Sequence, residues 1–144
     1  MSNDRCKIAI YYDIVSPYSY VAFQILLRYE KIWNIDLQVI PVFLGGIMKA
    51  SHNKPPALVP LKGRYLYKDL QRLSEMSHIK LKPPQDFMTR MLQSLKPMRL
   101  ITALNYYYPN QPELIIRSSI AFWRRLWRFD VEIETFTALQ EVLN

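Results

Sequence analysis

The chain has 144 residues, of which 50% are apolar, 13% are aromatic and 22% are charged. This composition suits one globular unit of common size and argues against disorder. Nineteen basic and twelve acidic residues give a net charge of +7, which favours anionic partners without naming one. The only glycines are Gly45, Gly46 and Gly63, which excludes a Walker loop and a dinucleotide fingerprint.

Metal, disulfide and membrane signals are weak in this sequence. The single cysteine, Cys6, excludes a CxxC redox pair and an internal disulfide. His52 and His78 stand far apart and match no zinc motif, so we expect no metal. The longest uncharged stretch, Ile14 to Leu27, is 14 residues long and contains polar side chains, so we expect no membrane span.

The first 42 residues predict a strand, a helix and a second strand. An apolar run predicts a strand over 7–12, and its lack of alternation indicates burial on both faces. Ser16 before Pro17 is typical of a helix start, because serine caps and proline takes the first helical position. The helix should fade near Trp33, and the second strand is expected over 37–42. Such a unit has parallel strands and a right-handed crossover.

The rest of the chain predicts a linker and then helices. The linker follows Gly46 and carries prolines, and no later glycine is present to form hairpin turns beyond Gly63. Residues 1–60 are therefore expected to form the βαβ part with its linker, and 61–144 a helical domain. Apolar spacing and flanking prolines place helices at about 63–76, 85–95, 98–107, 112–129 and 134–143.

Ser16 is the candidate site residue, because ligands of parallel α/β sheets bind at the carboxyl ends of strands, near helix N-termini. A serine hydroxyl at this place can donate a hydrogen bond to the thiolate of a bound molecule. Lowering the pKa of a free thiol from about 8.5 to about 6.5 takes roughly 2.7 kcal/mol. A hydroxyl donor gives about 1.5–3 kcal/mol and a helix N-terminus about 0.3–1 kcal/mol, which together suffice to stabilise a thiolate. The alternative is that Ser16 only caps the helix.

The sequence resembles the kappa class of glutathione transferases, in the thioredoxin-like superfamily that includes disulfide oxidoreductases of the DsbA type. The resemblance extends over almost the whole chain. It is carried by Ser16-Pro17-Tyr18-Ser19, the stretch 29–34, Gly46-Ile47-Met48-Lys49, Asn53-Lys54-Pro55-Pro56, the stretch 60–63, Met98-Arg99 and the stretch 132–134. The 2-hydroxychromene-2-carboxylate isomerases share this architecture and also use glutathione. An isomerase therefore stays an alternative.

The resemblance implies an α/β, thioredoxin-like βαβ fold with a large inserted all-helical domain. It also implies glutathione as co-substrate and an electrophile or a peroxide as second substrate. The glutathione-binding residues that it implies are Ser16 as catalytic thiolate stabiliser, Pro17, Tyr18, Asn53, Lys62 and Asp69. Family members are typically homodimers in mitochondria or peroxisomes, where they serve in detoxification. A cytoplasmic location stays open, because the sequence shows no targeting signal.

The chain departs from the family pattern at its end. Family members return after the helical insert to complete the sheet, so we expect the second half of the thioredoxin fold to be missing from these 144 residues. This favours a second interpretation, a non-catalytic truncated fragment or interaction module. A third candidate, nucleic-acid or membrane binding by arginines that alternate with Trp123 and Trp127, is less favoured than packing of these tryptophans in the core. We therefore expect no nucleic-acid partner.

Overall fold

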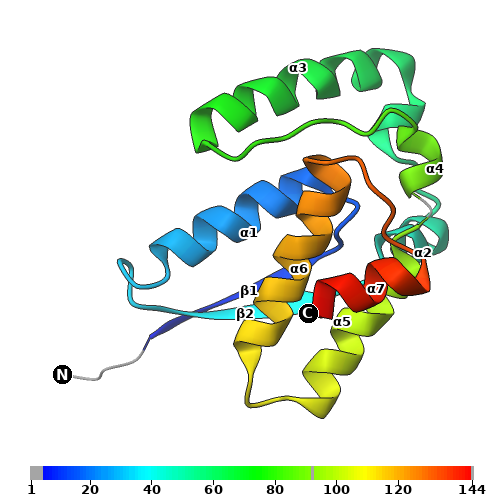
Figure 1. Cartoon of the computed structure of the whole chain (residues 1–144). Helices are drawn as coiled ribbons and strands as arrows, with labels where there is room; N and C mark the ends of the chain where they lie inside the picture. Colours follow the sequence, from blue (N-terminus) through cyan, green and yellow to red (C-terminus); the bar gives the residue numbers. More distant parts are fainter. Residues whose placement is uncertain (1–4, 92, 144) are drawn as a thin grey trace.

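The computed structural model describes residues 5–91 and 93–143, and Figure 1 shows the arrangement of the chain. The elements in chain order are β1 (Cys6–Tyr12), α1 (Pro17–Tyr29), β2 (Ile35–Pro41), α2 (Leu44–Ala50), a 3₁₀ turn (Pro56–Leu58), α3 (Pro60–Ser77), α4 (Phe87–Met91), α5 (Leu95–Tyr107), α6 (Pro112–Trp127) and α7 (Phe136–Leu143). The fold is thus mixed α/β, with a small parallel sheet and a large helical part, as predicted.

The βαβ start has the predicted topology. Strands β1 and β2 pair in parallel, from Cys6 opposite Ile35 to Tyr12 opposite Pro41. The second strand begins two residues earlier and ends one residue earlier than predicted, and the N–H of Val42 still donates to the carbonyl oxygen of Tyr12 at 2.9 Å. Within the described residues the sheet has these two strands and no third.

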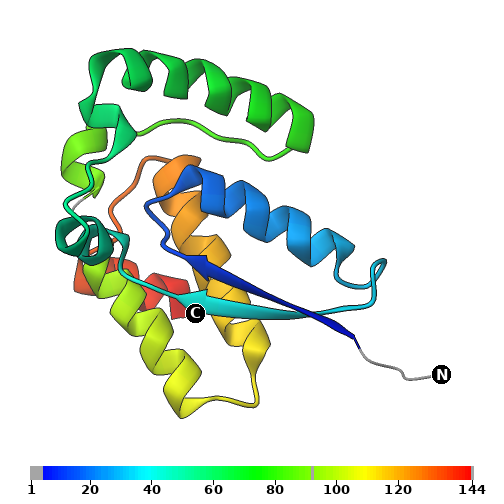
Figure 2. The same cartoon turned by 180° about the vertical axis from the view of Figure 1, so that it is seen from behind.

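The prediction that the first strand is buried on both faces is wrong. Burial alternates along β1, where Ile8 and Ile10 are half-buried while Lys7, Ala9 and Tyr11 are exposed. Figure 2 shows the reason, since both strands lie in front of α6 in this view. The described helices cover one face of β1, and an apolar run cannot by itself reveal how many faces are covered.

The helical part follows the prediction with shifted boundaries and one addition. The sequence did not predict α2, because Gly45 and Gly46 stand in its first turn. Helix α5 begins at Leu95, ahead of the predicted start at Met98, because Pro97 falls in its first turn, where no N–H is needed. The predicted helix at 85–95 is reduced to the short α4. None of the helices in the described ranges is long and apolar enough to cross a bilayer.

Among the described residues, no glycine adopts a positive φ angle. The described residues with positive φ angles are Asn34, His52, His78 and Asp130, at 49°, 54°, 58° and 52°. His78 ends α3 in the left-handed conformation that helices commonly use at their C-termini. The helical second part therefore needs no glycine after Gly63.

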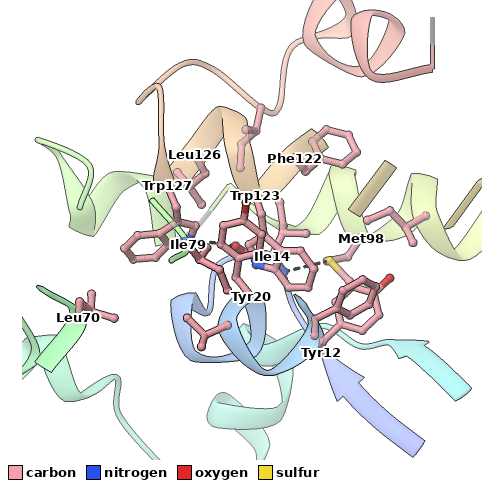
Figure 3. Close-up of a cluster of buried hydrophobic side chains, with 14 of the residues drawn as sticks. Tyr12, Ile14, Tyr20, Leu70, Ile79, Met98, Phe122, Trp123, Leu126 and Trp127 are labelled. Atoms are coloured by element: carbon pink, nitrogen blue, oxygen red, sulfur yellow. Dashed lines mark hydrogen bonds between the residues drawn. The ribbon is translucent and has the colours of Figure 1, made fainter. Parts of the chain in front are cut away.

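Helix α6 supplies the centre of the core (Figure 3). Its buried residues include Phe122, Trp123 and Trp127, which have no exposed surface. Trp123 stacks on Tyr20 of α1, with ring centroids 5.2 Å apart. The same core contains Tyr12 of β1, so residues from both predicted domains pack together. The division at residue 60 stays a prediction.

Candidate functional site

Ser16 caps α1, as its sequence context predicts. Its Oγ accepts a hydrogen bond from the backbone N–H of Ser19 at 3.1 Å, and Pro17 takes the first helical position. A hydroxyl oxygen accepts through its lone pairs and keeps its hydrogen for donation. No acceptor for that hydrogen occurs in residues 5–91 and 93–143. The cap therefore orients the hydroxyl at the positive end of a helix and leaves its hydrogen available.

The segment before Ser16 is organised by the buried carboxylate of Asp13. Its oxygens accept hydrogen bonds from the N–H of Val15 at 3.0 Å, the N–H of Leu44 at 2.8 Å and the hydroxyl of Ser94 at 3.0 Å. Burial raises the pKa of Asp13, although these three donors act in the opposite direction. This one side chain therefore connects the end of β1 to the start of α2 and the start of α5.

Two tryptophans of α6 hold the same segment from its other side. The indole N–H of Trp127 donates to the carbonyl oxygen of Ile14 at 3.1 Å, and that of Trp123 donates to the carbonyl oxygen of Ser16 at 3.2 Å. The sulfur of Met98 accepts from the N–H of Ile14 at 3.4 Å. Figure 3 shows Ile14 between Met98 and Trp127. Side chains 84 to 113 positions away thus fix the backbone that carries Ser16.

Ser16 opens into a cleft with mainly apolar walls. The cleft has a volume of about 170 Å³ and is lined by Val15, Ser16, Pro17, Tyr18, Leu44, Met48, Pro55, Pro56, Ala57, Leu66 and Phe87. A second cleft of about 380 Å³ shares Tyr18, Pro56 and Leu66 with it, so the two adjoin. The second cleft adds Lys62, which supplies a cation at its wall.

Tyr18 joins the cleft to α3. Its hydroxyl donates to Oδ2 of Asp69 at 2.7 Å. Burial, and then the hydrogen bond and the charge of Asp69, raise the pKa of Tyr18 to about 12. The phenol therefore stays protonated at neutral pH and holds the two helices together at the cleft.

The six residues expected from the resemblance fall into three groups. Ser16, Pro17 and Tyr18 line the first cleft. Lys62 lines the adjoining cleft. Asp69 does not line that cleft, but it accepts the hydrogen bond from Tyr18, which does. Asn53 is exposed on the loop after α2, where its side chain accepts a hydrogen bond from the N–H of Lys54 at 2.8 Å, and it lines neither cleft.

Residues that the site depends on were missed at the sequence level. Asp13 was not named there, and its three hydrogen-bond donors come from separate parts of the chain. Trp123 and Trp127 were predicted to pack, but nothing local indicated their carbonyl partners. Among the described residues no three His, Cys, Asp or Glu side chains gather as a metal-ligand set.

Comparisons with known proteins agree with this architecture. The family described as DSBA-like thioredoxin domain matches residues 7–144. Glutathione S-transferase kappa 1 of Homo sapiens is 43% identical over 88% of this chain and 55% of its own length. Its namesake from Rattus norvegicus is 37% identical over 95% and 59%. The chain thus spans somewhat more than half the length of these relatives.

A solved structure extends the agreement to three dimensions. A 2-hydroxychromene-2-carboxylate isomerase superposes with a TM-score of 0.68 at 20% identity, over 95% of this chain and 65% of the isomerase. At this identity the likeness concerns the fold. The family match covers all but the first six residues, and by that match the chain belongs to the DSBA-like thioredoxin domain family.

Proposed function

We propose that this chain carries the thiolate-stabilising half of a kappa-type glutathione transferase site. The observation that carries the proposal is the position of the Ser16 hydroxyl, which caps the N-terminus of α1 and lines the cleft. In the described structure its hydrogen is not donated to any acceptor. The relatives named as kappa glutathione transferases support glutathione as the thiol. Lys62 offers a partner for one of its carboxylates, with Pro17 and Tyr18 as walls.

The chemistry follows from the charge of the thiolate. Ser16 donates its hydrogen to the sulfur anion, and the dipole of α1 adds to the preference for negative charge. The sulfur then attacks an electrophilic carbon, a C–S bond forms, and the leaving group departs with its electron pair. With a peroxide, the sulfur takes one oxygen as the O–O bond breaks, and a second glutathione completes the reduction to glutathione disulfide. Asn53 stays a candidate contact for glutathione, and Asp69 stays a candidate contact for one of its charged ends.

The test is calorimetric titration of glutathione into the 144-residue chain, with the ultraviolet absorbance of the thiolate followed against pH. Ser16→Ala removes donor and cap together. Ser16→Asp keeps an N-cap acceptor of similar rank but cannot donate and adds negative charge. We expect both variants to bind less tightly and to raise the pKa of the bound thiol by about 1–2 units. Ser19→Ala, one turn along and with its backbone N–H intact, is the matched control.

Three outcomes separate the candidate functions. Conjugation of an aryl halide that depends on Ser16 supports the transferase. Isomerisation of 2-hydroxychromene-2-carboxylate instead supports the isomerase alternative. Binding without turnover supports a fragment or interaction module that keeps the half-site. An unchanged thiol pKa in Ser16→Asp would refute the role of Ser16. The homodimer and the mitochondrial or peroxisomal location stay predictions from the resemblance.

A further inference from the structure

A second hollow, away from Ser16, is lined by basic side chains. This basic recess has a volume of about 220 Å³, lies between α1, the segment after α3 and the end of α6, and is lined by Tyr20, Gln24, Arg28, His78, Ile79, Lys80, Arg124 and Arg128. A shallower hollow of about 400 Å³ shares Lys80 and Arg128 with it and adds Lys82. Neither hollow shares a lining residue with the two clefts near Ser16.

The charges of the recess are uncompensated within the described structure. Five arginines and lysines and one histidine line the two hollows, and no aspartate or glutamate does. The described ion pairs involve Arg90, Lys96 and Arg125 instead, and none includes a lining residue. Like charges brought together repel, so the cluster costs stability that an anion would offset.

The backbone around the recess is held in place. The guanidinium of Arg28 donates to the carbonyl oxygen of Ser77 at 2.7 Å, which ties α1 to the end of α3. The N–H of Lys82 donates to the carbonyl oxygen of Trp127 at 2.6 Å, which ties the following segment to the end of α6. Tyr20 and Ile79, which are 3% and 5% exposed, form an apolar floor. The cations therefore project from a fixed frame rather than from a loose loop.

Helix C-termini attract cations, but this accounts for only part of the cluster. Arg28 and Arg124 stand in the last turns of α1 and α6, where a positive charge complements the helix dipole. Lys80 and Lys82 lie outside any helix. At the end of α6, the carbonyl oxygen of Arg124 already accepts the N–H groups of Arg128 and Phe129. The helix dipoles therefore do not account for most of the positive charge in the two hollows.

We propose that the basic recess and the hollow beside it bind a small ligand that carries two or more adjacent phosphate groups. Guanidinium groups match phosphate oxygens in a bidentate fashion, and lysines add point charges. The recess has room for the phosphates, and the shallower hollow takes the adjoining part of the ligand. Adjacent phosphate groups occur both in free polyphosphorylated molecules and in phosphorylated lipid headgroups, which share this chemistry.

The test is calorimetric titration of inorganic tripolyphosphate into the 144-residue chain at low salt. The variant is the pair Lys80→Gln and Arg128→Gln, because these two residues line both hollows and are exposed. We expect about a hundredfold weaker binding, which corresponds to one charged hydrogen bond of about tenfold lost at each position. The matched control is the pair Arg99→Gln and Arg117→Gln, which removes the same charge from exposed positions outside both hollows.

Flotation with phosphatidylcholine vesicles that contain a phosphatidylinositol bisphosphate distinguishes the two sources. If the vesicles capture the chain and free tripolyphosphate prevents this capture, the recess binds a lipid headgroup. Binding of tripolyphosphate without capture assigns it to a soluble ligand. Absence of binding to either probe, or equal weakening in the control pair, overturns the proposal. Glutathione binding is expected to be unchanged in the recess variant, so this proposal and the transferase proposal fail independently.

Discussion

The indole N–H of Trp123 donates to the carbonyl oxygen of Ser16 across 107 residues of sequence. The cap of α1 is therefore held by α6, which lies far along the chain. Trp127 holds Ile14 in the same way, two residues earlier. The backbone that presents the Ser16 hydroxyl thus depends on the packing of the helical part, so the stability of α6 and the geometry of the candidate site are coupled.

Replacing Trp123 by phenylalanine tests this coupling. Trp123→Phe leaves the carbonyl of Ser16 with one partner fewer and opens a small void in a fully buried position. We expect the free energy of unfolding to fall by about 2–3 kcal/mol, from the lost hydrogen bond and the void together. Urea denaturation measures it. Trp33→Phe, at a site 56% exposed, is the control and should stay within about 0.5 kcal/mol of the parent.

Asp13→Asn tests the buried acceptor before the site. An amide has one acceptor oxygen, so its NH₂ group must face a backbone donor in either orientation: the N–H of Val15 at the position of Oδ1, or the N–H of Leu44 at the position of Oδ2. We expect a loss of about 1–3 kcal/mol in the free energy of unfolding. Asp36→Asn, at the half-buried second position of β2, is the matched control and should cost less than about 0.5 kcal/mol.

The pH dependence of that difference has a defined sign. Because burial raises the pKa of Asp13, the native state binds its proton more tightly than the unfolded state does. The contribution of this group to stability therefore falls as the pH rises from 3.8 through the raised pKa. The difference in the free energy of unfolding between parent and Asp13→Asn should become smaller over this pH interval and then stay constant. A gap that widens with rising pH would contradict the assignment.

Local sequence signals predicted the parts of the fold that are built locally. Ser16-Pro17 placed the start of α1, and prolines placed α5 and α6 within three residues. Helix α2 escaped because its glycines oppose helix formation. They are needed because the ring of Phe43 lies against them, and a Cβ at Gly46 would stand 2.9 Å from it. That contact is visible only once the chain has folded.

Long-range partners were out of reach of sequence patterns. The hydrogen bonds from Trp123 and Trp127 join residues more than a hundred positions apart, and no periodicity encodes them. The exposure of Tyr11 likewise depends on what covers the outer face of β1. The resemblance could name Asn53 as a contact, but it could not place that side chain relative to the clefts.

A glycine should stabilise the turn after α2. His52 has a φ angle of 54°, a conformation that strains a residue with a side chain. His52→Gly is expected to raise the free energy of unfolding by about 0.5–1 kcal/mol, because glycine adopts this angle without a steric penalty. His52→Ala keeps the strain and should give no gain. Thermal unfolding of the two variants beside the parent checks the difference, and an equal gain in both would argue against strain at this turn.

Tyr18→Phe tests the link between the cleft and α3. The variant loses the 2.7 Å hydrogen bond to Asp69, which is partly exposed, so we expect a cost of about 0.5–1.5 kcal/mol at neutral pH. The raised pKa of about 12 means that the native state holds the phenolic proton more tightly than the unfolded state, whose phenol titrates near 10.0. The stabilisation is therefore full below pH 10.0 and is lost as the pH rises through about 12. Denaturation at stepwise higher pH should bring the free energies of unfolding of parent and Tyr18→Phe together. The control is Tyr65→Phe, which removes an exposed hydroxyl from the wall of the same cleft and should follow the parent at every pH. A difference between parent and Tyr18→Phe that persists at the alkaline end would show that the stabilisation does not come from the hydrogen bond that the phenol donates to Asp69.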